Sequence, residues 1–297
     1  MVFRLLPDGT IEALTGAPDQ GGGAHTVLQR VAAATLSIEP RHIRVRYGNT
    51  AEARLDAGVG GSRSTHMIGR AAIEGGRLLK QKLEDLAAEV MGWPAGQVHL
   101  QNDAFIVEAA GGAERASFDA VASRIAAGPM VEVVGAYDPA EHHLEEGGDH
   151  SYYAYVVDVE VDPETGQVRV VNALAVVDVG AVINPIAHQG QLDGGFVYGL
   201  GQSLTEELIH EEGRIVTASL GDYKLPTQMD VPRFRTILLA RQPGPGPFGA
   251  KAAGETTNTG VGGAIANAIS DAVGVHITAT PITAERVLDA LRARGAV

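Results

Sequence analysis

The sequence predicts an α+β fold of mixed sheets and packed helices. Segments with apolar residues at helical spacing are interleaved with short strands and hairpins, without the regular β-α-β alternation of a doubly wound sheet. The chain has 297 residues, 45% hydrophobic and 20% charged, which is ordinary for a globular protein with a large core. We expect one domain over residues 1–297, with a subdomain boundary near residues 138–150, a polar stretch with two Gly and a Pro.

Turn and stop signals divide the first half of the chain into elements. The turn Pro7–Gly9 separates two short strands, Pro40 ends the first helix, and Gly92 and Pro94 end the second. The expected elements are strands at Phe3–Leu6 and Thr10–Leu14, a helix at His25–Leu36, a strand at His42–Gly48, a helix at Met67–Met91, strands at Gln97–Gln101 and Ala104–Glu108, a helix at Phe118–Ala126 and a strand at Val131–Tyr137.

The second half contains the clearest hairpin of the chain, around Pro163–Gly166 (PETG). Proline and glycine make Gln242–Lys251 a rigid connector, and Pro281 precedes the last helix. The expected elements are strands at Tyr152–Asp162 and Gln167–Asp178, a helix at His188–Glu207, a hairpin at Glu212–Gly213, a strand at Arg233–Ala240, and helices at Gly263–Val273 and Thr283–Arg294.

Charge and composition exclude several function classes. The chain has 23 Lys and Arg against 36 Asp and Glu, so its net charge of −13 would repel a nucleic-acid backbone. It has no cysteine, which excludes disulfides, thiolate metal sites and iron–sulfur clusters on this chain. No run approaches the ~20 apolar residues of a membrane span, and the first residues lack the apolar core of a signal peptide. We therefore expect a cytoplasmic protein.

Glycine is the outlier of the composition, with 38 of 297 residues against a usual share of about 7%. Four glycine-rich or polar segments lie at a helix entry or on a helix face, where backbone N–H groups suit a phosphate or another anion. In one of them, Ser62 and Ser64 add hydroxyls and Arg63 adds a guanidinium that matches phosphate oxygens. Each segment alone is more often a capped helix start, but four together favour a large anionic cofactor. The segments are Asp19–His25, Gly60–Thr65, Gly190–Gly195 and Ala252–Glu255.

Other candidate sites have weaker patterns. The histidines fit no standard zinc spacing, so we interpret them as surface or capping residues. Ser62 and Ser64 lack the G-x-S-x-G elbow of a nucleophilic serine. The stretch GVGGAIANA lacks the acidic residue that a dinucleotide fingerprint requires downstream. The histidines considered are His25, His66, His142, His143 and His188.

The acid at Glu255 is the strongest catalytic candidate. It follows a glycine-rich turn and precedes a long helix of small residues, and Gly254 leaves one flank open to a ligand. Such a carboxylate is a plausible general base, although many Gly-Glu pairs are ordinary turns.

In their order along the chain, these motifs resemble the C-terminal half of the large, molybdenum-binding subunit of the molybdenum hydroxylases, the xanthine dehydrogenase and aldehyde oxidase family. Five segments carry the resemblance and span nearly the whole chain. They are TGAPDQGGGAHTVLQRVAAATL, GVGGSRSTHMIGRAA, VVDVGAVINPIAHQGQLDGGFVYGLGQSLTEEL, DYKLPT and GAKAAGETTNTGVGGAIANAISDAVG.

The resemblance implies the fold of the family's second molybdopterin-binding domain and a set of site residues. Glu255, beside Gly254, matches the active-site glutamate that deprotonates a hydroxide on molybdenum. We expect burial near the metal to raise the pKa of this carboxyl. Gly21, Gly22, Gly23, Gly61, Ser62, Arg63 and Ser64 match loops around the pterin and its phosphates, and Gln191 matches a glutamine near the cofactor. The pterin holds the metal in this family, so no protein residue is expected as a metal ligand.

Two positions depart from the family's pattern. Gly22 stands where the family has a cofactor-facing glutamine, with Gln20 two residues earlier, and Ala252 stands where it has a glycine. The expected cofactor is molybdenum–molybdopterin, with a cytosine dinucleotide form left open. The expected partners are a subunit with the first molybdopterin-binding half, an iron–sulfur subunit and, optionally, an FAD subunit.

Three functions follow from these observations. The favoured one is the catalytic subunit of a heteromeric molybdenum hydroxylase, oxidising an aromatic N-heterocycle or an aldehyde with oxygen from water. The second is a non-catalytic interaction or assembly subunit that holds no cofactor of its own. The third is a generic phosphate-binding enzyme.

Overall fold

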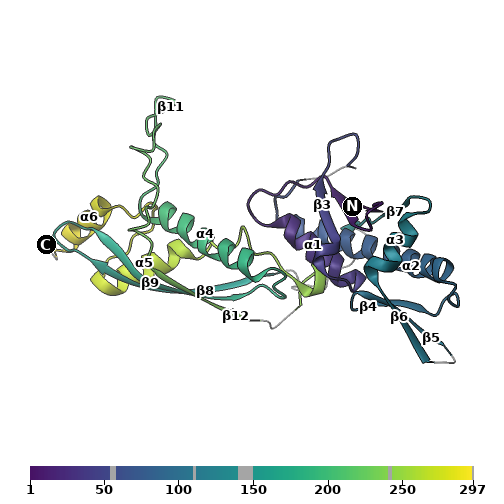
Figure 1. Ribbon diagram of the computed structural model, residues 1–297. Coiled ribbons are helices and arrows are strands. Elements are labelled where there is room, and N and C mark those ends of the chain that lie inside the picture. Colours follow the sequence, from purple (N-terminus) through teal and green to yellow (C-terminus); the bar gives the residue numbers. More distant parts are fainter. Residues whose placement is uncertain (54–57, 110–111, 140–149, 240–242, 296–297) are drawn as a thin grey trace. The chain divides into compact units, whose positions relative to one another are not determined.

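The computed structural model describes residues 1–53, 58–109, 112–139, 150–239 and 243–295 (Figure 1). The chain forms two compact units, each considered by itself. Unit 1 comprises Met1–Asp149, Ala181–Pro185 and Pro243–Lys251, and unit 2 comprises His150–Gly180, Ile186–Gln242 and Ala252–Val297. Of the expected boundary region 138–150, residues 140–149 lie outside the described part of the chain.

The described residues of unit 1 form two sheets and three α-helices. A four-stranded sheet has the order β3-β2-β1-β7, with β2 and β3 parallel and the other pairs antiparallel. A three-stranded antiparallel sheet has the order β4-β5-β6. The strands are β1 (Val2–Leu5), β2 (Ile11–Thr15), β3 (Ile43–Tyr47), β4 (Val98–Gln101), β5 (Ala104–Ala109), β6 (Gly112–Ser117) and β7 (Val131–Val134), and the helices are α1 (Ala24–Leu36), α2 (Gly69–Met91) and α3 (Phe118–Ala126).

The core of unit 1 joins both sheets to the helices. Phe3, Leu79, Phe105 and Phe118 are fully buried in one continuous cluster. Helices α1 and α2 pack closely because Gly76 leaves room for the side chain of Thr35. This packing fixes the start of α1 relative to the start of α2, where two of the glycine-rich segments lie.

Unit 2 is a three-stranded sheet with helices on one face. Its order is β12-β9-β8, with β8 and β9 antiparallel and β9 and β12 parallel. Phe196, Ile265 and Val287 belong to its core, which is separate from that of unit 1. Its elements are β8 (Tyr152–Val161), β9 (Val168–Asp178), α4 (Pro185–Leu204), β10 (His210–Glu211), β11 (Arg214–Ile215), β12 (Arg233–Leu239), α5 (Val261–Val273) and α6 (Ala284–Arg294).

The predicted α+β class is confirmed, and most elements lie within two or three residues of their expected bounds. Strand β6 was missed because its sequence, GAERAS, lacks β-branched and aromatic residues. The helix expected from Met67 begins instead with a π-helical turn, Ser64–Ile68, before α2. Helix α4 begins at Pro185, three residues before its expected start, since proline is well accommodated in a first helical turn.

Within the described residues, no helix is both long enough and apolar enough to cross a membrane.

Candidate functional site

The turn that carries Glu255 is held in unit 2 by four side-chain hydroxyls from other elements. Ser151 Oγ donates to the carbonyl of Ala252 at 2.5 Å, and Tyr153 donates to the carbonyl of Ala253 at 3.4 Å. Tyr198, on α4, donates to the carbonyl of Gly254 at 3.3 Å, and Tyr155, on β8, donates to that of Thr257. The carbonyls on both sides of Glu255 are therefore fixed to the sheet and to α4.

Two of the tyrosines that hold this turn, Tyr153 and Tyr155, remain hydrogen-bond donors at neutral pH. Burial raises the pKa of Tyr153 despite a hydrogen bond with Thr256, and burial also raises the pKa of Tyr155 far above its ordinary value. Because both phenols stay protonated, their bonds to the turn do not change across the physiological range.

Helix α4 packs directly against the same turn. A Cβ at Gly195 would overlap Thr257 Oγ1, and the side chain of Thr257 is fully buried. Gly254 lies next to Gln191, because a Cβ at position 254 would stand only 3.2 Å from Gln191 Oε1. Of the expected site residues, Gln191 and Gly254 are thus brought together beside Glu255.

The side chain of Glu255 itself is exposed in this chain. The expected burial of the carboxylate is therefore wrong for the chain alone. The four hydrogen bonds that anchor the turn all end on its main-chain carbonyls.

The first glycine-rich segment of unit 1 is capped by its own acid. Asp19 Oδ1 accepts the backbone N–H groups of Gly21 and Gly23 at 3.1 and 3.0 Å, and Oδ2 accepts that of His25 at 3.3 Å. Burial of Asp19 raises its pKa, but these three N–H groups lower it, and the net pKa lies below the ordinary value. Three donors expected to face an anion are thus already bonded to a carboxylate, while Gln20 and Gly22 are exposed beside them.

The second glycine-rich segment contains two residues with a positive φ. Gly61 has φ +71°, and a Cβ at Gly60 would meet no atom of the described residues within 4 Å. Ser62 also has a positive φ of 55°, a strained value for a serine that is found often at binding loops. Arg63 Nε donates to the carbonyl of Gly60 at 2.7 Å, which folds the guanidinium over the loop that leads into the π-helical turn.

These two segments end on neighbouring elements of unit 1, because α1, which contains His25, contacts the π-helical turn that contains Ser64. Gln20–Gly23 and Gly61–Ser64 belong to unit 1, whereas Gln191, Gly254 and Glu255 belong to unit 2.

The histidines form no metal site in the described part of the chain, where no cluster of three or more His, Asp or Glu side chains could hold an ion. His25 Nε2 bonds to the carbonyl of Ala17 at 2.9 Å, and His66 Nε2 lies 3.4 Å from the hydroxyl of Tyr137. His188 is half-buried: its Nε2 is buried with no hydrogen-bond partner among the described residues, and burial lowers its pKa. His142 and His143 lie outside the described residues.

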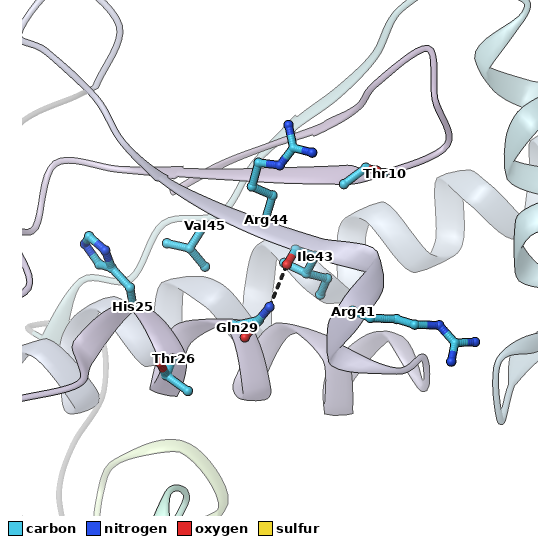
Figure 2. Close-up of a pocket in the computed structure, with 8 residues that line it drawn as sticks. All are labelled: Thr10, His25, Thr26, Gln29, Arg41, Ile43, Arg44 and Val45. Carbon is cyan, nitrogen blue, oxygen red and sulfur yellow. Dashed lines mark hydrogen bonds between the residues drawn. The ribbon is translucent and has the colours of Figure 1, made fainter. Parts of the chain in front are cut away.

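A hollow of about 380 Å³ lies between α1 and β3 of unit 1 (Figure 2). Gln29 is one of the residues that line it and donates to the carbonyl of Ile43 at 2.8 Å. Arg41 pairs with Glu39 and Asp103, and Figure 2 shows its guanidinium pointing away from that of Arg44. The two cations do not converge, so this hollow is a poorer anion site than the second glycine-rich segment.

Sequence reasoning missed the anchoring residues. Asp19 had a usable signal, since an Asp two residues before glycines at a helix start commonly accepts backbone N–H groups. Tyr153 and Tyr155 had none, because they lie about 100 residues before Glu255 and only the folded sheet brings them to it.

Comparison with known proteins identifies the class. A family model described as a molybdopterin cofactor-binding domain matches residues 1–232. The chain therefore belongs to the molybdopterin cofactor-binding domain family. It is similar to the probable hypoxanthine oxidase XdhD of Escherichia coli (strain K12), with 31% identity over 98% of this chain and 30% of that protein. It is also similar to the carbon monoxide dehydrogenase large chain of Afipia carboxidovorans, with 29% identity over 91% of this chain and 33% of the relative.

Solved structures agree with this assignment. The quinoline 2-oxidoreductase of Pseudomonas putida 86 aligns with a TM-score of 0.84 and 27% identity over 98% of this chain and 38% of that one. The carbon monoxide dehydrogenase of Oligotropha carboxidovorans aligns with a TM-score of 0.85 and 28% identity, over 99% of this chain and 37% of that one. The resemblance to part of a molybdenum hydroxylase large subunit is confirmed, and the chain spans between 30% and 38% of these proteins.

Proposed function

We propose that this chain is the molybdopterin-binding, catalytic part of a heteromeric molybdenum hydroxylase, with Glu255 as the general base. The observation that carries the proposal is the turn around Glu255. Four hydroxyls fix its main chain, Gln191 lies beside it, and Glu255 is exposed. A fixed backbone with an exposed acid is what proton transfer to a ligand requires.

The residues present suit an anionic pterin cofactor. The loop at Gly60–Ser64 combines glycines, two hydroxyls and a guanidinium, and we assign the phosphate contacts to Gly61, Ser62, Arg63 and Ser64. The loop at Gln20–Gly23 has a smaller part, because the carboxylate of Asp19 uses its N–H groups and would repel a phosphate. Gln20 and Gly22 remain contacts for the uncharged part of the pterin.

A bound molybdenum cofactor would supply the two-electron oxidation of the substrate, with oxygen from water. The protein's own contribution is to hold Glu255 Oε in place to accept a proton, with Gln191 as a neutral donor beside it. The four hydroxyls that donate to the turn hold its main chain in place while the proton is transferred. Desolvation of Glu255 would come from the polypeptide that covers this chain in the complete enzyme.

Substrate class and partners follow from the relatives by analogy. Their names refer to hypoxanthine, quinoline and an aldehyde oxidoreductase, so we propose an aromatic N-heterocycle or an aldehyde as substrate. We further propose that the cofactor is molybdenum–molybdopterin, either alone or as its cytosine dinucleotide. Iron–sulfur and FAD groups would be bound by partner chains, and the complex would be cytoplasmic.

The second candidate, a cofactor-free assembly subunit, draws support from the exposure of Glu255 and from the capped first loop. Molybdenum and pterin content of the purified complex separates the two. We expect near-stoichiometric metal in the wild-type complex and in the Arg77→Ala variant, which removes an exposed arginine of α2 paired with Glu74.

The Arg63→Ala variant tests the phosphate contact. Loss of a charge-assisted contact of about 1.5–3 kcal/mol should weaken cofactor retention at least tenfold. Wild-type complex that purifies without molybdenum would overturn the catalytic proposal, and full loading of Arg63→Ala would overturn the assignment of the phosphate loop.

A further inference from the structure

A segment of unit 2 exposes an unusual amount of apolar surface. We call Thr205–Val231, which follows α4, the arm. All of its residues are described, and its regular structure is limited to the β10–β11 hairpin, which stands away from the helices of its unit (Figure 1). Six of its large apolar side chains are between 43% and 90% exposed, namely Leu208, Ile215, Val216, Leu220, Leu225 and Met229.

Polar contacts give the arm its shape. Tyr223 donates its hydroxyl to Glu206 Oε2 at 2.7 Å, and Thr205 Oγ1 donates to the carbonyl of Lys224 at 2.8 Å. None of the six apolar side chains belongs to the core of unit 2. The arm is thus ordered without burying them, whereas surface loops usually carry polar residues at such positions.

The comparisons indicate what would cover the arm. The relatives are about three times as long as the part that this chain matches, so most of a large subunit lies in polypeptide that these 297 residues do not include. The arm's 27 residues are within the size of one side of a specific interface, about 20–30 residues. It carries six acidic and two basic residues, so the matching surface would be apolar with a basic rim.

We infer that the arm is the docking element through which this chain binds the remaining part of its large subunit, the polypeptide expected to hold the first molybdopterin-binding half. This inference rests on the proposed function, because that function requires the complementary polypeptide. The arm's apolar side chains are buried in the contact, and its carboxylates face basic residues at the rim.

Binding of the full chain to that complementary polypeptide tests the inference by calorimetry. The test variant combines Leu220→Asp with Met229→Asp, which are 73% and 90% exposed and therefore leave the core unchanged. The matched control is Met130→Asp, an exposed methionine of unit 1 (75%). We expect the arm variant to bind at least tenfold more weakly and the control to bind like the wild type. Hydrogen exchange should show protection of residues 208–229 in the wild-type complex.

Two results would overturn the inference. One is equal affinity of the arm variant and the wild type, with no protection of the arm. The other is a wild-type chain that sediments as a dimer through the arm, which would make a second copy the occupant. A complex that forms through the arm but contains no molybdenum would refute the proposed function and leave the docking result standing.

Discussion

The glycine-rich segment at Asp19–His25 and the turn at Ala252–Thr257 look alike in sequence and differ in which backbone groups they use. In the first, a carboxylate of the chain accepts the N–H groups of Gly21, Gly23 and His25. In the second, hydroxyls donate to the carbonyls, and the acid of the motif is left exposed. A segment whose backbone N–H groups donate to its own carboxylate is a structural cap. The turn at Ala252–Thr257 is held through its carbonyls, and Glu255 within it is exposed.

The largest effect should come from the contact between α4 and the turn. Gly195→Ala places a methyl group on the buried hydroxyl of Thr257, and such overpacking costs about 1–3 kcal/mol or more. Gly194→Ala on the same helix meets no atom within 4 Å and should stabilise by about 0.5–1 kcal/mol. Urea unfolding should therefore show changes in the free energy of unfolding, relative to the wild type, that have opposite sign in the two variants. Equal effects would mean that α4 does not hold the turn.

The next effect concerns the hydroxyl tethers. Tyr155→Phe leaves the carbonyl of Thr257 without its donor, which should cost about 1–2 kcal/mol and speed hydrogen exchange at residues 255–258. The exposed Tyr47→Phe serves as the control and should change stability by less than about 0.5 kcal/mol. Unchanged exchange in Tyr155→Phe would show that the turn is held by packing alone.

The smallest effect concerns the cap of the first segment. Asp19→Ala removes an acceptor of three N–H groups and should cost about 1 kcal/mol, whereas Asp19→Asn keeps most of the capping geometry. The pKa of Asp19 is lower in the folded state than its ordinary value of 3.8. The stabilisation that its charged form provides is therefore complete above this value and is lost as the pH falls through the folded pKa.

Unfolding measured between about pH 6 and pH 3 should therefore show a steeper acid loss in the wild type than in Asp19→Asn. Parallel curves would indicate that the three N–H groups do not depend on the carboxylate charge.

Much of the fold could be predicted from local signals, and much less of the site. The α3 bounds, the PETG hairpin and the Gly92 stop follow from periodicity and turn residues. The order of five motifs indicated the family. The sequence did not predict which side chains form hydrogen bonds with the backbone of each loop. Tyr155, for example, reaches the carbonyl of Thr257 only because the sheet pairs and α5 packs against it. The exposure of Glu255 could not be predicted either, because the motif does not show what surrounds this side chain in the fold.

The central claim is that Glu255 accepts the proton in turnover. The direct measurement is kcat of the assembled, molybdenum-loaded complex carrying Glu255→Gln, beside the exposed turn variant Glu164→Gln as control. We expect Glu255→Gln to keep its metal and pterin and to lose about 10²–10⁴ in kcat, while Glu164→Gln turns over like the wild type. Loaded Glu255→Gln complex with wild-type kcat would contradict the account.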